Sequence, residues 1–292
     1  MDTIIQILAR ELGRSEAHVE NVVRLIDEGN TIPFIARYRK ELHGAMDDTA
    51  LRTLADRLQY LRNLDKRREE VKSAIEGQGK LTEELSAAID AAATLAEVED
   101  LYRPYRQKRR TRATVAREKG LEPLAELLFA QAADGPAPEE AAGAFVDPEK
   151  GVETAEDALQ GASDIIAERI SDDADIRKRL RELVWKKGYL VSAAAAKEPE
   201  DTVYRLYYAF RSPLNRVQGH QVLAINRGER EGVLKVSVEM EREAALIPVR
   251  RAVLNPGAPA MAFVRAAAED AYDRLIFPSV EREMRGLLTE QA

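Results

Sequence analysis

The sequence contains no cysteine among its 292 residues and only three histidines, His18, His43 and His220. Without thiols the chain cannot form disulfides, cysteine nucleophiles or thiolate metal sites. The histidines lie far apart and form no His-x-x-x-His pair, so a metal site would need donors that only the fold brings together. We therefore expect no metal and no cofactor.

Long apolar runs and a positive net charge are also missing. No run approaches the roughly 20 apolar residues that span a bilayer, and the first residues lack the positive start of a signal peptide. We therefore expect a cytoplasmic protein with no membrane partner. The balance of 44 Lys and Arg against 51 Asp and Glu gives a net charge of -7, which argues against a generic nucleic-acid coat protein.

Motifs of catalysis are not found in the sequence. No Gly-x-x-x-x-Gly-Lys-Ser/Thr loop occurs, and residues 228–232 lack the third glycine of a dinucleotide fingerprint. Ser212 and Ser279 each lie next to a proline, without a nucleophile-elbow pattern. We expect no catalytic residue and no enzymatic activity.

Capped apolar periodicity predicts helices from the start of the chain. A first helix should end at Gly13, and Ser15 can cap a second that ends near Gly29. This pair has a helix-turn-helix-like outline. The second helix carries acids that would repel phosphate, so we favour a packing unit over a DNA reader. These acids are Glu16, Glu20, Asp27 and Glu28.

A long amphipathic helix is predicted between Asp47 and Gly77. Its leucines recur at steps of three and four and indicate a face buried within this chain rather than a coiled-coil seam. The stripe begins with Leu51, Leu54, Leu58, Leu61 and Leu64. Thr82 and Thr94 can cap two further helices, the second of which Pro104 interrupts.

The second half of the chain repeats this helical pattern with one β segment. Thr154 should open one helix, Asp172 or Asp173 another, and Gly188 should end it. Alternation over residues 233–238 predicts a strand, isolated or paired in a hairpin with residues 245–249. Helix returns from residue 260.

The predicted fold is mainly α, a multi-helix array with helix-turn-helix-like units and a small β excursion near residues 233–250. The expected regions are a helical region 1–132, a connector 133–153 that includes a Gly-Pro-x-Pro run, and a second helical region 154–292 with short strands.

Residues 31–41 join apolar and cationic side chains. An exposed Tyr38 between Arg37 and Arg39, followed by Lys40, could stack on a base or ring. The alternative, which we favour from the sequence, is that Phe34 and Tyr38 fill the helical core while the arginines pair with acids.

A sharply basic segment, residues 103–119, stands in this acidic chain. Pro104 prevents a regular helix, so the cations should lie on an extended or turn segment suited to phosphate contact. The candidate nucleic-acid-binding residues are Arg103, Tyr105, Arg106, Lys108, Arg109, Arg110 and Arg112. A solvated loop, or a latch onto the protein's own acids with Tyr102 and Tyr105 buried, remains open.

The residue ranges 31–41, 99–112, 120–125 and 227–234 resemble the N-terminal region of the Tex family in the same order along the chain. Arg103 and Gln107 depart from the family pattern, which has an apolar residue and a proline there, and this alters the stiffness and charge of the loop.

The resemblance implies a bacterial, cytoplasmic transcription accessory protein that associates with RNA polymerase and with RNA or DNA. It also implies that the chain ends before the family's RNase H-like domain, helix-hairpin-helix elements and OB-type RNA-binding domain. The expected role is a non-catalytic scaffold. A competing interpretation is a purely protein-binding helical module without nucleic-acid contact.

Overall fold

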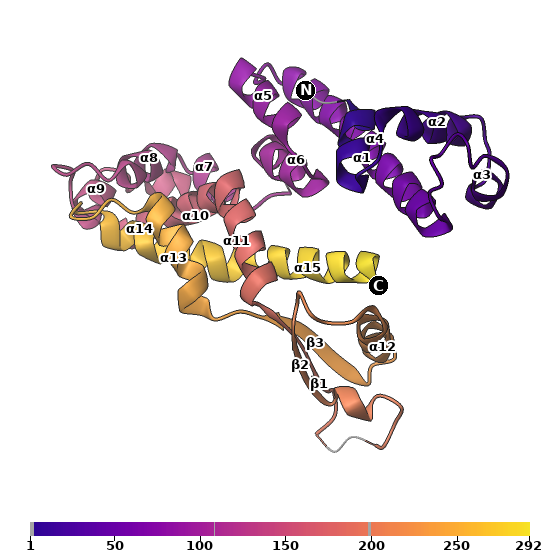
Figure 1. Ribbon diagram of the computed structural model, residues 1–292. Helices are drawn as coiled ribbons and strands as arrows, with labels where there is room; N and C mark the ends of the chain where they lie inside the picture. Colours follow the sequence, from indigo (N-terminus) through magenta and orange to yellow (C-terminus); the bar gives the residue numbers. More distant parts are fainter. Residues whose placement is uncertain (1–2, 108, 198–199) are drawn as a thin grey trace. The chain divides into compact units, whose positions relative to one another are not determined.

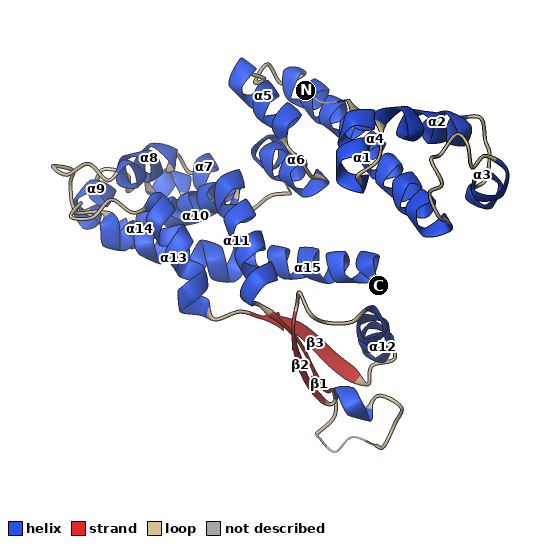
Figure 2. Cartoon of the chain, viewed as in Figure 1, coloured by secondary structure: helices blue, strands red, loops and turns tan. Residues whose placement is uncertain are grey.

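The computed structural model describes residues 3–107, 109–197 and 200–292 (Figures 1 and 2). Helices of all kinds hold 67% of the structure, which confirms a mainly α protein. The chain divides into two compact units, Met1–Tyr102 and Arg103–Ala292. The expected boundaries were 132 and 154, whereas the helices within residues 112–143 all pack against the helix Ala155–Ser171 of the second unit.

The first unit is built around one long helix. Its elements are α1 (Ile4–Leu12), α2 (Glu16–Asp27), α3 (Ile32–Tyr38), α4 (Asp48–Glu76), α5 (Glu83–Ala91) and α6 (Leu95–Tyr102). The other five helices all pack against α4. Its leucine stripe is buried, Leu58 included, which confirms the predicted core face. Helix α4 starts where the Asp47 carboxylate accepts a hydrogen bond from the Ala50 N–H at 2.7 Å.

The second unit is a helical bundle joined to a small sheet. It begins with the 3-10 turn η1 (Arg103–Tyr105), followed by α7 (Arg112–Glu118), α8 (Glu122–Ala130), α9 (Pro138–Gly143), η2 (Pro148–Lys150), α10 (Ala155–Ser171) and α11 (Ala174–Lys187). After the first strands come α12 (Gly219–Arg230), α13 (Arg242–Val253), α14 (Met261–Asp270), η4 (Ala271–Ile276) and α15 (Phe277–Gln291).

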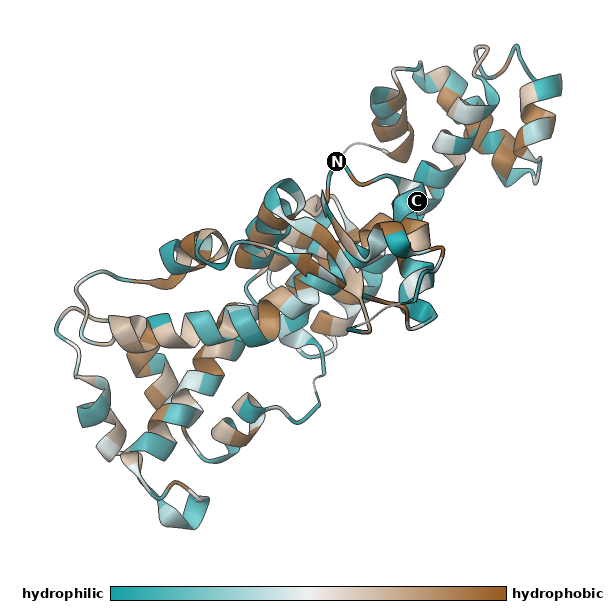
Figure 3. Cartoon of the chain, turned by 90° about the horizontal axis from the view of Figure 1, so that it is seen from below, coloured by the Kyte–Doolittle hydropathy of each residue, from teal (hydrophilic) through white to brown (hydrophobic). Residues whose placement is uncertain are grey.

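Helix α10 lies at the centre of this bundle, in contact with α7, α8, α9, α14 and η4. Gly161 permits the close approach, because a Cβ there would lie 2.3 Å from Leu121 Cδ1 and 3.2 Å from Ala116 Cβ. Brown and teal residues alternate along the helical ribbons of Figure 3, as expected for helices with one buried face.

The sheet has three antiparallel strands in the order β2-β1-β3: β1 (Tyr189–Ala194), β2 (Ala209–Pro213) and β3 (Leu234–Glu239). Tyr189 stands opposite Pro213 on one side and Glu239 on the other. On the outer edge of β3 the Val238 N–H donates to the Glu281 carboxylate of α15 at 2.7 Å.

The strand predicted at 233–238 is confirmed, but its predicted hairpin partner is wrong. Residues 245–249 lie in α13, and β3 pairs with β1 instead. The Glu241 side chain accepts hydrogen bonds from the N–H groups of Glu243 and Ala244 and so starts a helix just after the strand. Pro248 inside α13 removes one donor, while the apolar face of the helix is buried.

The segment η4 is a π-helix between α14 and α15. A proline ring clashes with the carbonyl four residues earlier, which for Pro278 is that of Arg274. The wider π turn relieves this clash, and such turns often occur at functional sites. Within the described residues, no helix combines the length and apolar character needed to cross a bilayer.

Candidate nucleic-acid interface

The basic segment starts at the first residue of the second unit. Helix α6 ends at Tyr102 and the Arg-Pro-Tyr sequence forms η1, so the predicted interruption at Pro104 is confirmed. Thr111 then caps α7 by accepting a hydrogen bond from the Thr114 N–H at 3.1 Å. Arg112 is therefore the first residue of a helix rather than part of an extended segment.

Most predicted cations of this segment lie on the surface. The side chains of Arg106, Arg109, Arg110 and Arg112 are exposed, whereas Arg103 and Tyr105 are half-buried. Lys108 lies outside the described residues. Arg110 Nη2 contacts Glu118 Oε2 at 2.7 Å, with both side chains mostly exposed, so one cation of the basic segment pairs with an acid of the same segment.

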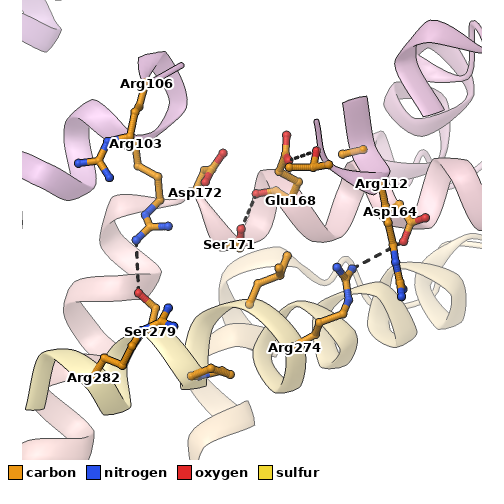
Figure 4. Close-up of a pocket in the computed structure, with 14 residues that line it drawn as sticks. Arg103, Arg106, Arg112, Asp164, Glu168, Ser171, Asp172, Arg274, Ser279 and Arg282 are labelled. Atoms are coloured by element: carbon orange, nitrogen blue, oxygen red, sulfur yellow. Dashed lines mark hydrogen bonds and ion pairs between the residues drawn. The ribbon is translucent and has the colours of Figure 1, made fainter. Parts of the chain in front are cut away.

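Three of these arginines line a cavity of about 600 Å³ in the second unit (Figure 4). Arg103, Arg106 and Arg112 come from η1, the loop after it and α7, and two further arginines come from η4 and α15. The polar lining residues are Arg103, Arg106, Thr111, Arg112, Asp164, Glu168, Ser171, Asp172, Arg274, Ser279 and Arg282. Five arginines thus face three carboxylates, and the lining carries a net positive charge.

The carboxylates of the cavity are engaged by neighbouring groups. Glu168 accepts hydrogen bonds from Thr111 Oγ1 at 2.9 Å and from Arg117 at 2.8 Å. Asp164 lies 3.6 Å from Arg274 Nη2, and a dashed line in Figure 4 marks this ion pair. Burial raises the pKa of Asp164, although the charges of Arg274 and Arg112 act in the opposite direction. These acids therefore serve to position arginines and hydroxyls around the cavity.

Arg112 and Arg282 complete the cationic side of the cavity. Both side chains are exposed, and neither forms a salt bridge within residues 3–107, 109–197 and 200–292. Guanidinium groups offer forked donors that match the oxygens of phosphate. An anion that entered the cavity would therefore meet cations not already neutralised by a bonded acid.

Ser279 connects the cavity to the interior. Its hydroxyl accepts hydrogen bonds from Arg103 Nη2 at 3.4 Å and from Arg177 Nη2 at 2.8 Å. Arg177 is completely buried and also contacts Glu283 Oε1 at 2.8 Å. This network connects η1, α11 and α15, so Arg103 is positioned by residues of the interior of the unit.

The secondary candidates lie in the first unit, at the end of α3. Arg37, Tyr38, Arg39 and Lys40 are all exposed. The prediction that Phe34 and Tyr38 fill the core is wrong, because 38% of Phe34 and 58% of Tyr38 are exposed. A seven-residue helix offers the core only one narrow face, and Ile35 occupies it.

Sequence reasoning missed Arg274 and Arg282, the cavity arginines from the C-terminal helices. A spacing of eight residues places two side chains near the same face of a helix, and Ser279 lies between them. The spacing of Arg274 and Arg282 was therefore the sequence feature that could have indicated a shared face. It carried no information that these helices pack beside the basic segment, more than 150 residues earlier in the chain.

Two parts of the sequence match known families. Residues 134–292 match the Tex central region-like family, and residues 2–76 match the Tex-like protein N-terminal domain. The chain belongs to the Tex family. The first match alone covers more than half of the chain, so the predicted resemblance is confirmed.

Individual relatives of this Tex-family chain come from bacteria and from animals. It is 44% identical over 290 residues to the uncharacterized protein YdcI of Bacillus subtilis, 98% of this chain and 40% of the relative. It is 40% identical over 239 residues to the transcriptional accessory protein Tex of Neisseria gonorrhoeae, 82% of this chain and 31% of the relative.

A human relative, S1 RNA-binding domain-containing protein 1, is 30% identical over 305 residues, covering 99% of this Tex-family chain and 30% of its own length. The chain therefore spans between 30% and 40% of the length of these three proteins.

Proposed function

We propose that this Tex-family chain is a non-catalytic helical scaffold of a transcription accessory protein that holds RNA or DNA by its phosphates. The observation that carries the proposal is the convergence of five arginines on one cavity beside the basic segment. The name of the Neisseria relative, a transcriptional accessory protein, supports the setting, and that of the human relative supports RNA as a ligand.

The chemistry of the site favours phosphate over bases. Arginine forks pair with two phosphate oxygens at once, and such contacts position a nucleic acid without reading its sequence. The tyrosine of this segment, Tyr105, is half-buried, so it offers little ring surface for stacking. We expect binding that is independent of sequence and weakened by salt.

The wider role follows from the family. We propose that the protein works in the cytoplasm in association with RNA polymerase, with the scaffold presenting nucleic acid to the enzyme. No catalytic step is proposed, because the arginines and acids of the cavity are arranged in ion pairs and hydrogen bonds that position one another.

The test replaces exposed cations that form no salt bridge with another described residue. The triple variant Arg109→Gln, Arg112→Gln and Arg282→Gln is compared with the wild-type chain for retention of single-stranded RNA and duplex DNA across a salt series. For every phosphate that the variant no longer neutralises, the log-log salt slope should become shallower by about 0.7 for single strands and about 0.9 for the duplex. We expect the variant to bind more weakly as well.

A matched control removes the same charge elsewhere in the unit. Arg179, Arg251 and Arg265 are exposed, and their replacement by glutamine changes the net charge equally. Retention by this control should stay close to wild type. Equally weakened binding in both triples would mean that only total charge matters. Unchanged binding by the first triple would refute the phosphate site and favour the alternative, a protein-binding module.

A further inference from the structure

Helix α3 presents two aromatic rings to solvent, with arginines beside them. The ring centroids of Phe34 and Tyr38 lie 5.2 Å apart, and their planes are inclined by 46°. The guanidinium of Arg37 lies 5.9 Å from the Tyr38 ring, and that of Arg39 lies 5.8 Å from the Phe34 ring. We call Phe34, Arg37, Tyr38, Arg39 and Lys40 the α3 cluster.

The cations of the α3 cluster differ from those of α4 in the same unit. Arg57, Arg62 and Arg67 each contact a carboxylate at 2.6 to 2.7 Å. Within the described parts of the chain, Arg37, Arg39 and Lys40 form no such pair. Their charges face water beside the rings, and Glu41 is the one acid among residues 34–41.

The α3 cluster is fixed on the first unit rather than carried by a loose loop. Ile35 is completely buried, and α3 packs against α2 and α4. The chain that follows is held by a hydrogen bond from Asn21 Nδ2 to the Leu42 carbonyl at 3.2 Å. Burying Phe34 and Tyr38 elsewhere would require α3 to leave this position.

Exposed rings with unpaired cations match the chemistry of unpaired nucleotides. Aromatic side chains stack on the face of any base, and neighbouring arginines contact the phosphates on either side. In a duplex the base faces are covered by their neighbours, so a ring has no face to stack on. Aromatic rings and arginine also occur at protein interfaces, but lysine is depleted there, so a cluster of three such cations that includes Lys40 fits a phosphate backbone better.

From this arrangement we infer that the α3 cluster is a second nucleic-acid site, which binds single strands by stacking a base on Tyr38 or Phe34. The inference rests on the proposed function only in taking nucleic acid as the ligand. Its chemistry is different, because the cavity contacts phosphates alone, whereas the α3 cluster also stacks on bases. The two sites can therefore be separated by the choice of probe.

The experiment uses the whole 292-residue chain and three probes of equal length: oligouridine, an abasic ribose-phosphate strand and duplex RNA. Tyr38→Ala and the double variant Phe34→Ala, Tyr38→Ala should bind oligouridine about tenfold more weakly than wild type, the effect of removing one stacked base. Binding to the abasic strand and the duplex should not change, nor should the salt slope.

Two control variants test whether the weaker binding is caused by loss of the aromatic ring. Tyr38→Phe keeps the ring and should bind oligouridine as the wild type does. Leu206→Ala removes an apolar side chain that is 84% exposed in the second unit and should have no effect. Thermal unfolding by circular dichroism confirms that each variant is folded, which is expected because the replaced rings are exposed.

The outcomes separate this inference from the phosphate site. Base-dependent weakening in Tyr38→Ala supports the stacking site even if the Arg109, Arg112 and Arg282 triple binds normally. Wild-type binding of oligouridine by the double variant would overturn it, as would equal weakening on the abasic strand or no binding of oligouridine by the wild-type chain.

Discussion

Replacement of Glu283 by glutamine tests how much this carboxylate stabilises the second unit through its contact with the buried Arg177. Glu283 of α15 contacts Arg177 at 2.8 Å and Arg181 at 2.9 Å. The Arg177 side chain is 0% exposed and that of Glu283 is 30% exposed. Glutamine keeps the shape of the side chain but removes its charge, so the buried Arg177 guanidinium would lose the charge of Glu283.

Removal of one partner of a buried ion pair costs on the order of 3 to 5 kcal/mol. The lower end of that range applies here, because Ser279 and the Ser171 carbonyl still accept from Arg177 and the glutamine oxygen can accept one bond. We expect a loss of about 3 kcal/mol, a urea midpoint shift of about 1 M at an m-value of about 3 kcal/mol/M.

The chain provides a specific optical reporter for this measurement. Trp185 is its one tryptophan and lies in α11, the helix that carries Arg177. Its fluorescence follows unfolding of the second unit. Glu126→Gln is the matched control, since Glu126 pairs with Arg169 while 59% exposed, and exposed pairs contribute little.

The stability that the Glu283 carboxylate contributes should depend on pH in a definite direction. Burial raises the pKa of Glu283, but the charges of Arg181 and Arg177 outweigh it and hold that pKa below its ordinary value of 4.5. A group whose pKa is lower in the folded state stabilises that state at pH values above its pKa in the unfolded chain. This contribution is lost as the pH falls through its pKa in the folded state. The difference in free energy of unfolding between wild type and Glu283→Gln should be constant over a roughly neutral range of about pH 6 to 8. It should shrink below pH 4.5. A difference no larger than that of Glu126→Gln would refute the reasoning.

Two further changes test the packing of each unit. Leu58→Ala removes a side chain that is 3% exposed in α4 and should cost on the order of 2 to 5 kcal/mol, measured by circular dichroism during urea unfolding; near-wild-type stability would show that the leucine stripe is not the core. Gly161→Ala places a Cβ 2.3 Å from Leu121 Cδ1 and should destabilise the second unit by about 1 to 3 kcal/mol, followed by Trp185 fluorescence. A neutral effect of Gly161→Ala would mean that the Leu121 side chain shifts at little cost.

Helix starts were predictable because a cap is a local interaction. Ser15, Thr82 and Thr154 each accept a hydrogen bond from an N–H three residues later, as their sequence positions indicated. The choice between Asp172 and Asp173 was left open by the sequence. The structure selects Asp173, whose carboxylate accepts from the Ile176 N–H at 2.9 Å.

The sheet was only partly predictable, because strand pairing is decided by distant residues. The alternation in β3 was visible in the sequence, but β1 follows α11 directly and is short, so its six residues gave no separate signal. Residues 245–249 looked like a strand for their branched side chains. The carboxylate of Glu241 starts a helix there instead.

The candidate sites show the same difference between local and distant information. The break at Pro104 and the cations after it were evident from the sequence, since a proline acts on its own backbone. The contribution of Arg274 and Arg282 to the cavity depends on packing between distant helices. Exposure of Phe34 and Tyr38 was also decided by packing, because Ile35 alone fills the face of α3 that meets the core.

The π-helical turn η4 has a consequence for insertions and deletions in this family. A π turn bonds residues five apart rather than four and so holds one residue more than an α-helical turn. Deletion of one residue between Ala271 and Ile276 should therefore convert it into an α-helical turn with little rotation of the helix that follows. Ser279, Arg282 and Glu283 all follow this turn on α15. A single-codon deletion within this turn should keep these side chains in place, whereas the same deletion in α15 just before Ser279 would turn them by about 100°, away from the cavity and from Arg177.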